Sequence, residues 1–193
     1  MLGDYRVIEL ADERGQLAGS VLASLGAEVI TVEPPGGSHS RSVGPFAGDV
    51  VSPDTSLWHW SYNRGKKSVV LDLETSEGRD ELLRLTDGAD IVIDAFGPEV
   101  LRTLGLGYEV MSERNSALIY LSISAFGDDG PKALWEATDL TIMASGGQMS
   151  LAGDLDRAPL RIPLPQAYMH ASSEAVSAAL IALYERQHNS GLG

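Results

Sequence analysis

The side chains best suited to chemistry lie in the loops that follow short β-branched segments of this sequence. The first such loop reads ADERGQLAG and follows Leu10. A nicotinamide-binding protein needs GxGxxG here, because the glycines allow a tight turn and a close approach of the pyrophosphate. Only Gly15 and Gly19 are present, although Glu33 lies where a ribose-binding acid is expected. The incomplete fingerprint gives little support to a NAD-dependent oxidoreductase.

Other common catalytic patterns are missing from the sequence. It has no cysteine, which excludes disulfides, thiolate zinc sites and cysteine nucleophiles. Neither a GxxxxGK[ST] phosphate loop nor a GxSxG serine elbow occurs. The four histidines stand apart without metal-ligand spacing, so no metal site is predicted. His170 and Glu174 can share one helix face, but such a spacing is more typical of a surface ion pair than of an active site.

The composition is that of a globular domain with an acidic surface. The chain has 193 residues, 44% of them hydrophobic and 21% charged, with a formal net charge of −13. This charge argues against binding nucleic acid or an anionic membrane, and leaves room for an anionic small ligand held by a few local cations. The opening MLGDYRVIEL lacks a signal-peptide pattern, and no apolar run approaches bilayer length. A cytoplasmic protein is expected.

Strand-like segments alternate with helical patterns along the chain. The expected strands are residues 6–10, 28–32, 68–72, 91–94 and 118–124. The expected helices are residues 15–25, 56–62, 75–85, 100–104, 108–114, 136–149 and 166–187. This alternation predicts an α/β fold, a Rossmann-like open and mostly parallel sheet flanked by helices, as one domain over residues 1–193.

Two segments depart from this alternation. Residues 33–56 are rich in Pro, Gly and Ser and long for a loop, which is typical of a functional loop or one that packs on a partner. The last helix is rich in alanine, and the sequence stops at HNSGLG where a further strand is expected. A missing partner for this helix is therefore expected. Its predicted inner face consists of Ala167, Ala171, Ala175, Ala178, Ala179 and Ala182, with Ile181 and Tyr184.

Five local sequences at the strand ends carry a specific resemblance when they are read in order. They are LGAEVITVEPPGG (25–37), YNRGKKSVVLDLETSEGR (62–79), ADIVIDAFGPEVLRTLGLGYE (89–109), LIYLSISAFGDDGP (118–131) and the Pro-rich run that leads into the last helix. Together they resemble the N-terminal half of the family III CoA-transferases (CaiB/BaiF-like), which include formyl-CoA transferases and α-methylacyl-CoA racemase. The resemblance covers essentially the whole chain.

The resemblance implies a part of a larger assembly. Family members are about twice this length and form interlocked dimers, with a Rossmann-like large domain completed by residues that return from the C-terminal part. By this resemblance, the chain forms most of the large domain and lacks the small domain. It also implies coenzyme A or an acyl-CoA as the ligand, and a second copy or a complementary subunit or domain as the partner.

The resemblance places the coenzyme A contacts in three loops. Lys66, Lys67 and Arg102 are the cations that it offers to phosphates. Pro34 and Glu74 occupy places where some relatives carry cations. The full set of implied contact residues is Arg14, Gly15, Asn63, Lys66, Lys67, Leu71, Ala95, Phe96, Gly97, Arg102 and Leu104, with Asp12 and Glu13 in the first loop.

The same resemblance leaves the chain without a nucleophile. Family transferases form an acyl anhydride on an aspartate at the start of the last helix, where this sequence reads IPLPQAYMHASSE and the matching residue is Tyr168. A phenol with a pKa near 10 cannot replace a carboxylate in anhydride chemistry. The histidine of the racemase branch corresponds to Thr138, next to Asp139. Asp139, His170 and Glu174 are weak substitutes, and no catalytic residue is predicted.

The leading hypothesis is therefore a family III domain that contributes to CoA transfer between carboxylic acids within a larger assembly, without its own aspartate nucleophile. The alternative is a non-catalytic half that binds coenzyme A or acts as a scaffold, or a truncated fragment. A NAD-dependent oxidoreductase remains only because it shares the fold class.

Overall fold

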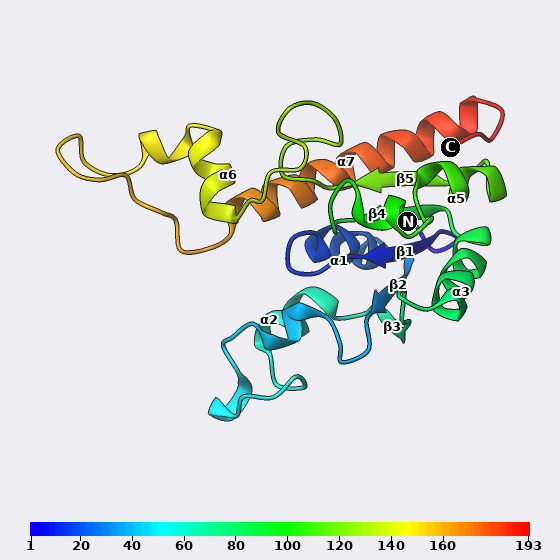
Figure 1. Cartoon of the computed structure of the whole chain (residues 1–193), viewed down its shortest axis with the longest axis horizontal. Helices are drawn as coiled ribbons and strands as arrows, with labels where there is room; N and C mark the ends of the chain where they lie inside the picture. The colour runs from blue at the N-terminus through cyan, green and yellow to red at the C-terminus, as the bar shows by residue number, and fades with distance from the viewer.

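Five parallel strands form a single sheet in the computed structural model, which describes residues 1–193 (Figure 1). The strands are β1 (Arg6–Leu10), β2 (Glu28–Glu33), β3 (Lys67–Val70), β4 (Ile91–Asp94) and β5 (Ile119–Ser122). Their order across the sheet is β3-β2-β1-β4-β5, and every neighbouring pair is parallel. The predicted Rossmann-like α/β fold is thereby confirmed.

The helices begin and end close to the predicted positions. The α-helices are α1 (Gln16–Ser24), α2 (Leu57–Asn63), α3 (Ser76–Asp87), α4 (Val100–Thr103), α5 (Tyr108–Arg114), α6 (Asp139–Ser145) and α7 (Gln166–His188), and the 3₁₀ helices are η1 (His39–Ser42), η2 (Ala47–Asp49) and η3 (Gln148–Leu151). Side-chain caps fix the starts of α3 and α2. The Thr75 hydroxyl accepts a hydrogen bond from the Gly78 N–H at 3.1 Å, and Ser56 caps α2 in the same way.

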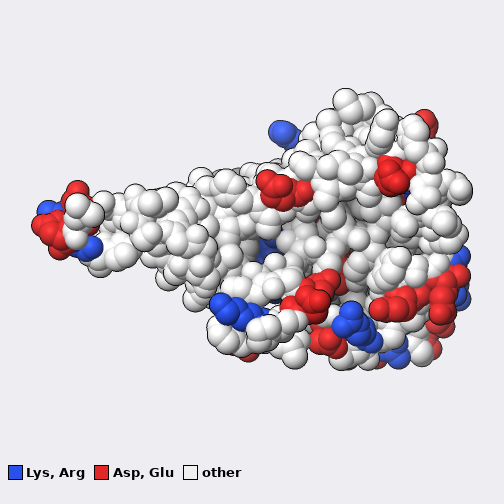
Figure 2. All heavy atoms as spheres, turned by 90° about the horizontal axis from the view of Figure 1, so that it is seen from above, with Lys and Arg blue, Asp and Glu red and all other residues white.

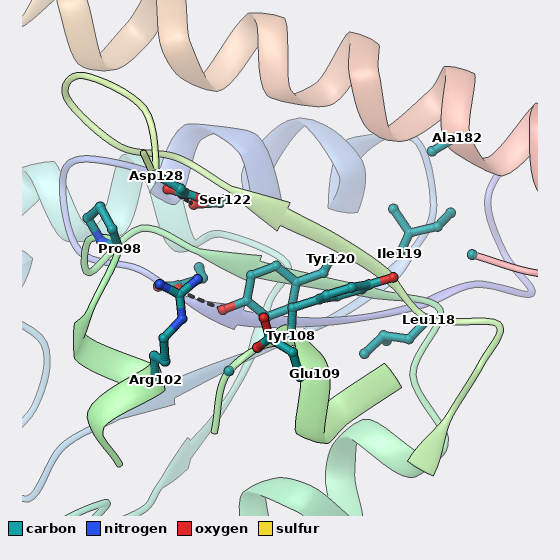
Figure 3. Close-up of a pocket in the computed structure, with 13 residues that line it drawn as sticks. Pro98, Arg102, Tyr108, Glu109, Leu118, Ile119, Tyr120, Ser122, Asp128 and Ala182 are labelled. Atoms are coloured by element: carbon teal, nitrogen blue, oxygen red, sulfur yellow. Dashed lines mark hydrogen bonds between the residues drawn. The ribbon is translucent and has the colours of Figure 1, made fainter. Parts of the chain in front are cut away.

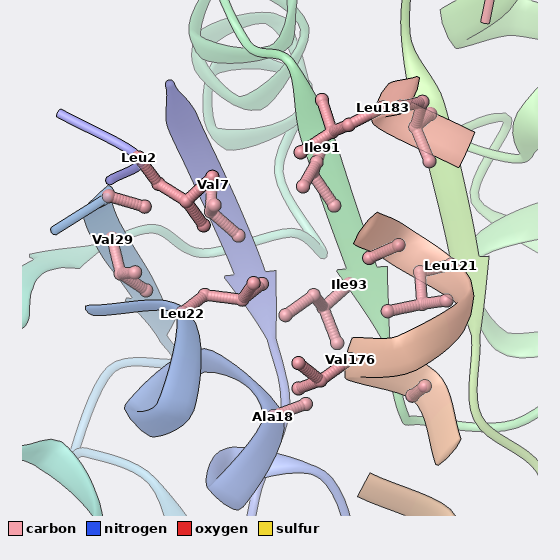
Figure 4. Close-up of a cluster of buried hydrophobic side chains, with 14 residues drawn as sticks. Leu2, Val7, Ala18, Leu22, Val29, Ile91, Ile93, Leu121, Val176 and Leu183 are labelled. Carbon is pink, nitrogen blue, oxygen red and sulfur yellow. The ribbon is translucent and has the colours of Figure 1, made fainter. Parts of the chain in front are cut away.

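Each strand sends alternate side chains to opposite faces of the sheet, which creates two apolar cores. Val7 and Ile93 face α1 and α7, where they pack with Leu22 and Val176 (Figure 4). Ile8 and its neighbours on the other face pack against α3, α4 and α5. The sheet is thus the middle layer of three, and the near-continuous apolar runs of β1 and β4 follow from burial on both faces.

The inner face of α7 differs from the predicted one. Its buried residues are Ser172, Ala175, Val176, Ala179 and Leu183. Ala175 and Ala179 were predicted correctly, but Ala178 is exposed, and Ile181 and Tyr184 are 69% and 66% exposed. Alanines occur all round this helix, so they do not fix its rotation. Val176 and Leu183 fix it instead, because they fill the core beside β4 and β5.

The segment between β5 and α7 contains less helix than predicted. The expected helix over residues 136–149 is confined to α6, which Thr138 caps by accepting from the Thr141 N–H, and it ends at Gly146. Gly147 then adopts a positive φ of 79°, which breaks the helix before η3.

Residues 136–165 form an arm, which tapers away from the body and carries its charged side chains mainly at the tip (Figure 2). None of the helices has both the length and the apolar composition needed to cross a bilayer.

Candidate functional site

The strand order reverses between β1 and β4, and the chain leaves these two strands in opposite directions. Open parallel sheets bind ligands in the crevice at such a point, beyond the carboxyl ends of the strands. The loops after β1 and β4 approach closely here, since a Cβ atom on Gly15 would lie 2.6 Å from the Ala95 Cβ. Glycine is therefore required at residue 15 for the two loops to pack.

Two cavities open at this crevice. The crevice cavity, of about 340 Å³, lies over β1, β2 and β4, and its walls include Leu71, His39 and Leu104. The α7 cavity, of about 710 Å³, lies between the loop after β4, the start of α7 and residues 133–137, and it contains Tyr168. Arg14, Phe96 and Val100 line both cavities. The two cavities are thus neighbouring parts of one candidate site.

The structure brings together about half of the implied coenzyme A contacts. The residues that line one or both cavities are Arg14, Leu71, Ala95, Phe96, Gly97 and Leu104. Gly15 lies behind them, packed on Ala95. Asn63, Lys66, Lys67 and Arg102 do not line either cavity. The apolar part of the predicted site is therefore at the crevice, and its predicted cations are elsewhere.

Lys66 is buried inside the domain. Its Nζ atom donates to both carboxylate oxygens of Glu9, at 2.8 and 2.7 Å, and to the Gln16 carbonyl at 2.8 Å. The side chains of Lys66 and Glu9 are 1% and 0% exposed, and Thr31 donates a further hydrogen bond to Glu9. Burial raises the pKa of Glu9, while the neighbouring Lys66 opposes this effect. The charge of Lys66 is therefore balanced within the fold.

The other two predicted cations also have carboxylate partners. Lys67 forms an exposed ion pair with Glu28 at 2.5 Å. Arg102 donates to Glu99 at 2.9 Å and lines a third cavity, of about 450 Å³, beside β5 (Figure 3). Tyr120 and Asp94 also line this cavity, and the Tyr120 hydroxyl donates to Asp94 at 2.7 Å.

Asn63 belongs to a buried polar cluster between α1 and α2. Its amide nitrogen donates to the Gln16 side chain at 3.2 Å and to the His59 carbonyl at 3.0 Å. The Ser40 hydroxyl lies 2.8 Å from Nδ1 of His59. Burial lowers the pKa of His59, which favours the neutral ring in this cluster. Asn63 thereby joins α2 to α1 beneath the crevice.

Glu33 is a structural residue of the site whose role the sequence did not reveal. Its carboxylate accepts from Nε of Arg41 at 2.6 Å, from the Ser38 N–H at 2.9 Å and from the Ser68 hydroxyl at 2.6 Å. Mainly because of the Arg41 hydrogen bonds, the pKa of Glu33 falls to about 2. Glu33 thus fastens the start of the long loop, which supplies Ser38 and His39 to the crevice wall. The only feature of the sequence that could have indicated this ion pair is the short spacing between Glu33 and Arg41.

Arg14 is the one basic side chain that lines both cavities. Its Nε and Nη2 atoms donate to the Asp12 carboxylate at 2.8 and 2.7 Å. This local pair directs the guanidinium along the crevice, and Nη1 has no hydrogen-bond partner in the protein. The neighbouring Glu13 pairs with Nδ1 of His39 at 2.9 Å, which raises the pKa of His39.

Tyr168 lies in the first turn of α7 and faces the α7 cavity. Burial raises the pKa of its hydroxyl, so the phenol is neutral at pH 7. His170, Glu174 and Asp139, the other candidates for a catalytic residue, do not supply a free carboxylate at the position of Tyr168. His170 and Glu174 are exposed on α7. The buried Asp139 carboxylate accepts from the Ala167 N–H at 2.8 Å and thereby holds the start of α7.

Comparison with known proteins identifies the family. The family model described as CoA-transferase family III matches residues 2–193. This chain belongs to that family. Among its relatives, a protein of Thauera aromatica named as the BbsE subunit of succinyl-CoA:(R)-benzylsuccinate CoA-transferase is 38% identical over 95% of this chain and 45% of its own length. The succinate–glutarate CoA-transferase of Agrobacterium fabrum is 39% identical over 94% of this chain and 46% of its own.

A solved structure supports the same assignment. The crystal structure of a CaiB/BaiF family protein from Brucella suis superposes with a TM-score of 0.90 and 37% identity, over 98% of this chain and 50% of that one. The chain therefore spans about half the length of the family III proteins that it matches. The predicted membership of family III, as the N-terminal portion, is confirmed.

We predict that Lys66 is essential to this family III domain as a structural residue. Replacing Lys66 by Met leaves the buried Glu9 without its cation, so we expect the free energy of unfolding to fall by about 3 kcal/mol or more. Lys67→Met, at the next residue, removes only an exposed pair and should have little effect. Urea unfolding measures both. Equal stability of the two variants would show that the Glu9–Lys66 pair is dispensable.

We predict a pH-dependent contribution from Glu33. Its pKa in the folded chain is about 2, below its ordinary value of 4.5, so its ionised form stabilises the fold above pH 4.5. This stabilisation is lost as the pH falls from 4.5 towards 2. The difference in melting temperature between the unchanged protein and Glu33→Gln should therefore be largest near neutral pH and close towards pH 2. Arg41→Gln should reproduce the effect, and a difference that is constant with pH would contradict it.

Proposed function

We propose that this chain is the acyl-CoA-binding half of a family III assembly that transfers CoA between carboxylic acids, and that it supplies no aspartate nucleophile. The observation that carries the proposal is Tyr168, which faces the α7 cavity beside the crevice. Tyr168 matches the nucleophile position by sequence, and the nearby Asp139 is bonded to the Ala167 N–H. The two carboxylates that line the cavity, Glu99 and Glu136, come from other segments of the chain than the start of α7. Ionised phenolate is scarce at pH 7, and an aryl ester is not the anhydride that the reaction needs.

The crevice offers a coherent set of contacts for coenzyme A. Leu71, Phe96 and Leu104 give the crevice cavity an apolar wall that suits an adenine ring or a pantetheine arm. Arg14 and His39 are its basic side chains. Phosphates would rely on these two groups and on backbone amides, since Lys66, Lys67 and Arg102 do not line the crevice cavity. The α7 cavity then receives the acyl end.

A partner is supported by the apolar side chains that the chain exposes. On the arm, Leu151, Leu155 and Leu160 are all more than half exposed, and so is Leu134 just before it. On α7, Ile181 and Tyr184 face away from the sheet. Apolar exposure on this scale is typical of a surface that is covered by another chain or by another part of the same chain. We therefore propose a second copy, a complementary subunit, or a further part of the same protein as the partner.

The second candidate is a non-catalytic half of such an assembly that serves as a scaffold and binds no coenzyme A. The carboxylate-paired cations favour it, because they leave few positive groups for three phosphates. Ligand binding separates the two candidates.

We predict that coenzyme A stabilises the chain against thermal unfolding. At about 100 times its Kd, a ligand that binds only the folded state adds about 2.7 kcal/mol, which appears as a higher midpoint. Phe96→Ala should abolish the shift, because Phe96 lines both cavities, while Phe46→Ala, in the long loop, should keep it. Differential scanning fluorimetry measures all three proteins. The absence of any shift for the unchanged chain would favour the scaffold.

We also predict that Tyr168→Asp restores covalent chemistry. A carboxylate at this position can attack a thioester, whereas the phenol cannot, so only the variant should gain mass when it is incubated with an acyl-CoA. Intact-protein mass spectrometry detects the adduct, and Tyr184→Asp, on the exposed side of α7, is the control. CoA transfer by the unchanged chain on its own would overturn the proposal that it lacks a nucleophile.

A further inference from the structure

The lining of the α7 cavity includes two hydrogen-bond donors, Arg14 and Tyr168. Arg14 enters it from the loop after β1, and Tyr168 enters it from the first turn of α7. Nη1 of Arg14 has no partner in the protein, and the Tyr168 hydroxyl, which accepts from the Asp139 backbone N–H, donates to no protein acceptor. Burial raises the pKa of the Tyr168 hydroxyl, and the positive charge of Arg14 opposes this effect. A guanidinium and a neutral phenol together suit one anionic oxygen acceptor.

Three acidic groups near these donors, Asp12, Glu13 and Asp139, already have partners. Asp12 holds Nε and Nη2 of Arg14, and Glu13 is paired with His39. Asp139 accepts the Ala167 N–H, with Arg161 3.9 Å from its second oxygen. The free side of Arg14 therefore keeps its attraction for an external anion.

We propose that Arg14 and Tyr168 bind the free carboxylate of an apolar monocarboxylic acid in the α7 cavity. The side chain at residue 168 then receives a substrate carboxylate instead of supplying one. The proposal rests on the proposed function, because it takes the α7 cavity as the acyl end of that site. It goes further by naming the class of acid and the two residues that select it.

The residues that line the cavity favour one class of carboxylic acid over another. They are mostly apolar, with Phe96, Trp135 and Ile142 among them, and suit an alkyl or aryl body. Arg14 is the only cation in the lining, whereas Glu99 and Glu136 are both anionic. A second carboxylate on the ligand would have no cation to meet and would be repelled by these two glutamates. The geometry thus favours a monocarboxylate over a short dicarboxylate.

Isothermal titration calorimetry on the whole chain tests this assignment without coenzyme A. The probe is hexanoate at pH 7, compared with succinate and with the uncharged methyl hexanoate. We expect saturable binding of hexanoate and at least tenfold weaker binding of the other two. Equal binding of methyl hexanoate would show that the carboxylate is not recognised. Equal binding of succinate would overturn the preference for a monocarboxylate.

Two variants assign the binding to these residues. Tyr168→Phe removes only the hydroxyl and should raise the Kd for hexanoate about tenfold or more, as expected for a hydrogen bond to a charged group. Arg14→Gln should weaken binding at least as much. Tyr184→Phe, on the exposed side of α7, and Arg84→Gln, on α3, are the matched controls and should leave the Kd unchanged.

The outcomes separate this inference from the proposed function. Loss of hexanoate binding in Tyr168→Phe, with the coenzyme A thermal shift intact, would support both. Unchanged hexanoate affinity in Tyr168→Phe and Arg14→Gln, or no saturable binding at all, would overturn the carboxylate site even if coenzyme A still stabilised the chain. A circular dichroism melt of each variant confirms that a loss of binding does not reflect unfolding.

Discussion

The close packing of Gly15 on Ala95 is the constraint on which the site depends. Because no side chain fits at residue 15, the loops after β1 and β4 meet at the point where the strand order reverses. Their contact places Arg14 and Phe96 side by side on the walls of both cavities. Gly15, which is part of the incomplete dinucleotide fingerprint in the sequence, thus has a packing role. A larger residue there would separate the loops and dismantle the crevice before it affected any ligand contact.

Hydrophobic periodicity was sufficient to predict the sheet but not the rotation of every helix. The strands are short β-branched runs that are buried on both faces. This pattern is typical of a parallel sheet covered by helices on both sides. In α7 the alanines surround the helix, so the pattern left its orientation open. The orientation depends on where Val176 and Leu183 fit against β4 and β5, which is a tertiary property. The exposed Ile181 and Tyr184 follow from that fit.

Of the contacts that the resemblance implies, the apolar residues line the crevice, whereas Lys66, Lys67 and Arg102 do not. Leu71, Phe96 and Leu104 follow directly from strand ends, and their place along the chain determines where they lie. The partners of the two lysines lie far away in sequence: Lys66 meets Glu9 across 57 positions, and Lys67 meets Glu28 across 39. Single-sequence reasoning has no access to such pairings. An acidic chain with 14 basic residues against 27 acidic ones makes them common, and cations that look free in the sequence are neutralised in the fold.

Under the proposed function, a phenol stands at residue 168 in place of a carboxylate, which changes what the start of α7 can do. A carboxylate there would form an ion pair with Arg14 and exclude a second anion from the cavity. A neutral phenol leaves Arg14 with an unfilled donor and adds an O–H beside it. If both proposals hold, the missing nucleophile and the anion-binding position have the same cause, because both follow from the absence of one negative charge at residue 168. In a family whose reaction passes CoA from one carboxylic acid to another, a half-site of this kind can still contribute by holding the acid whose carboxylate reacts elsewhere in the assembly.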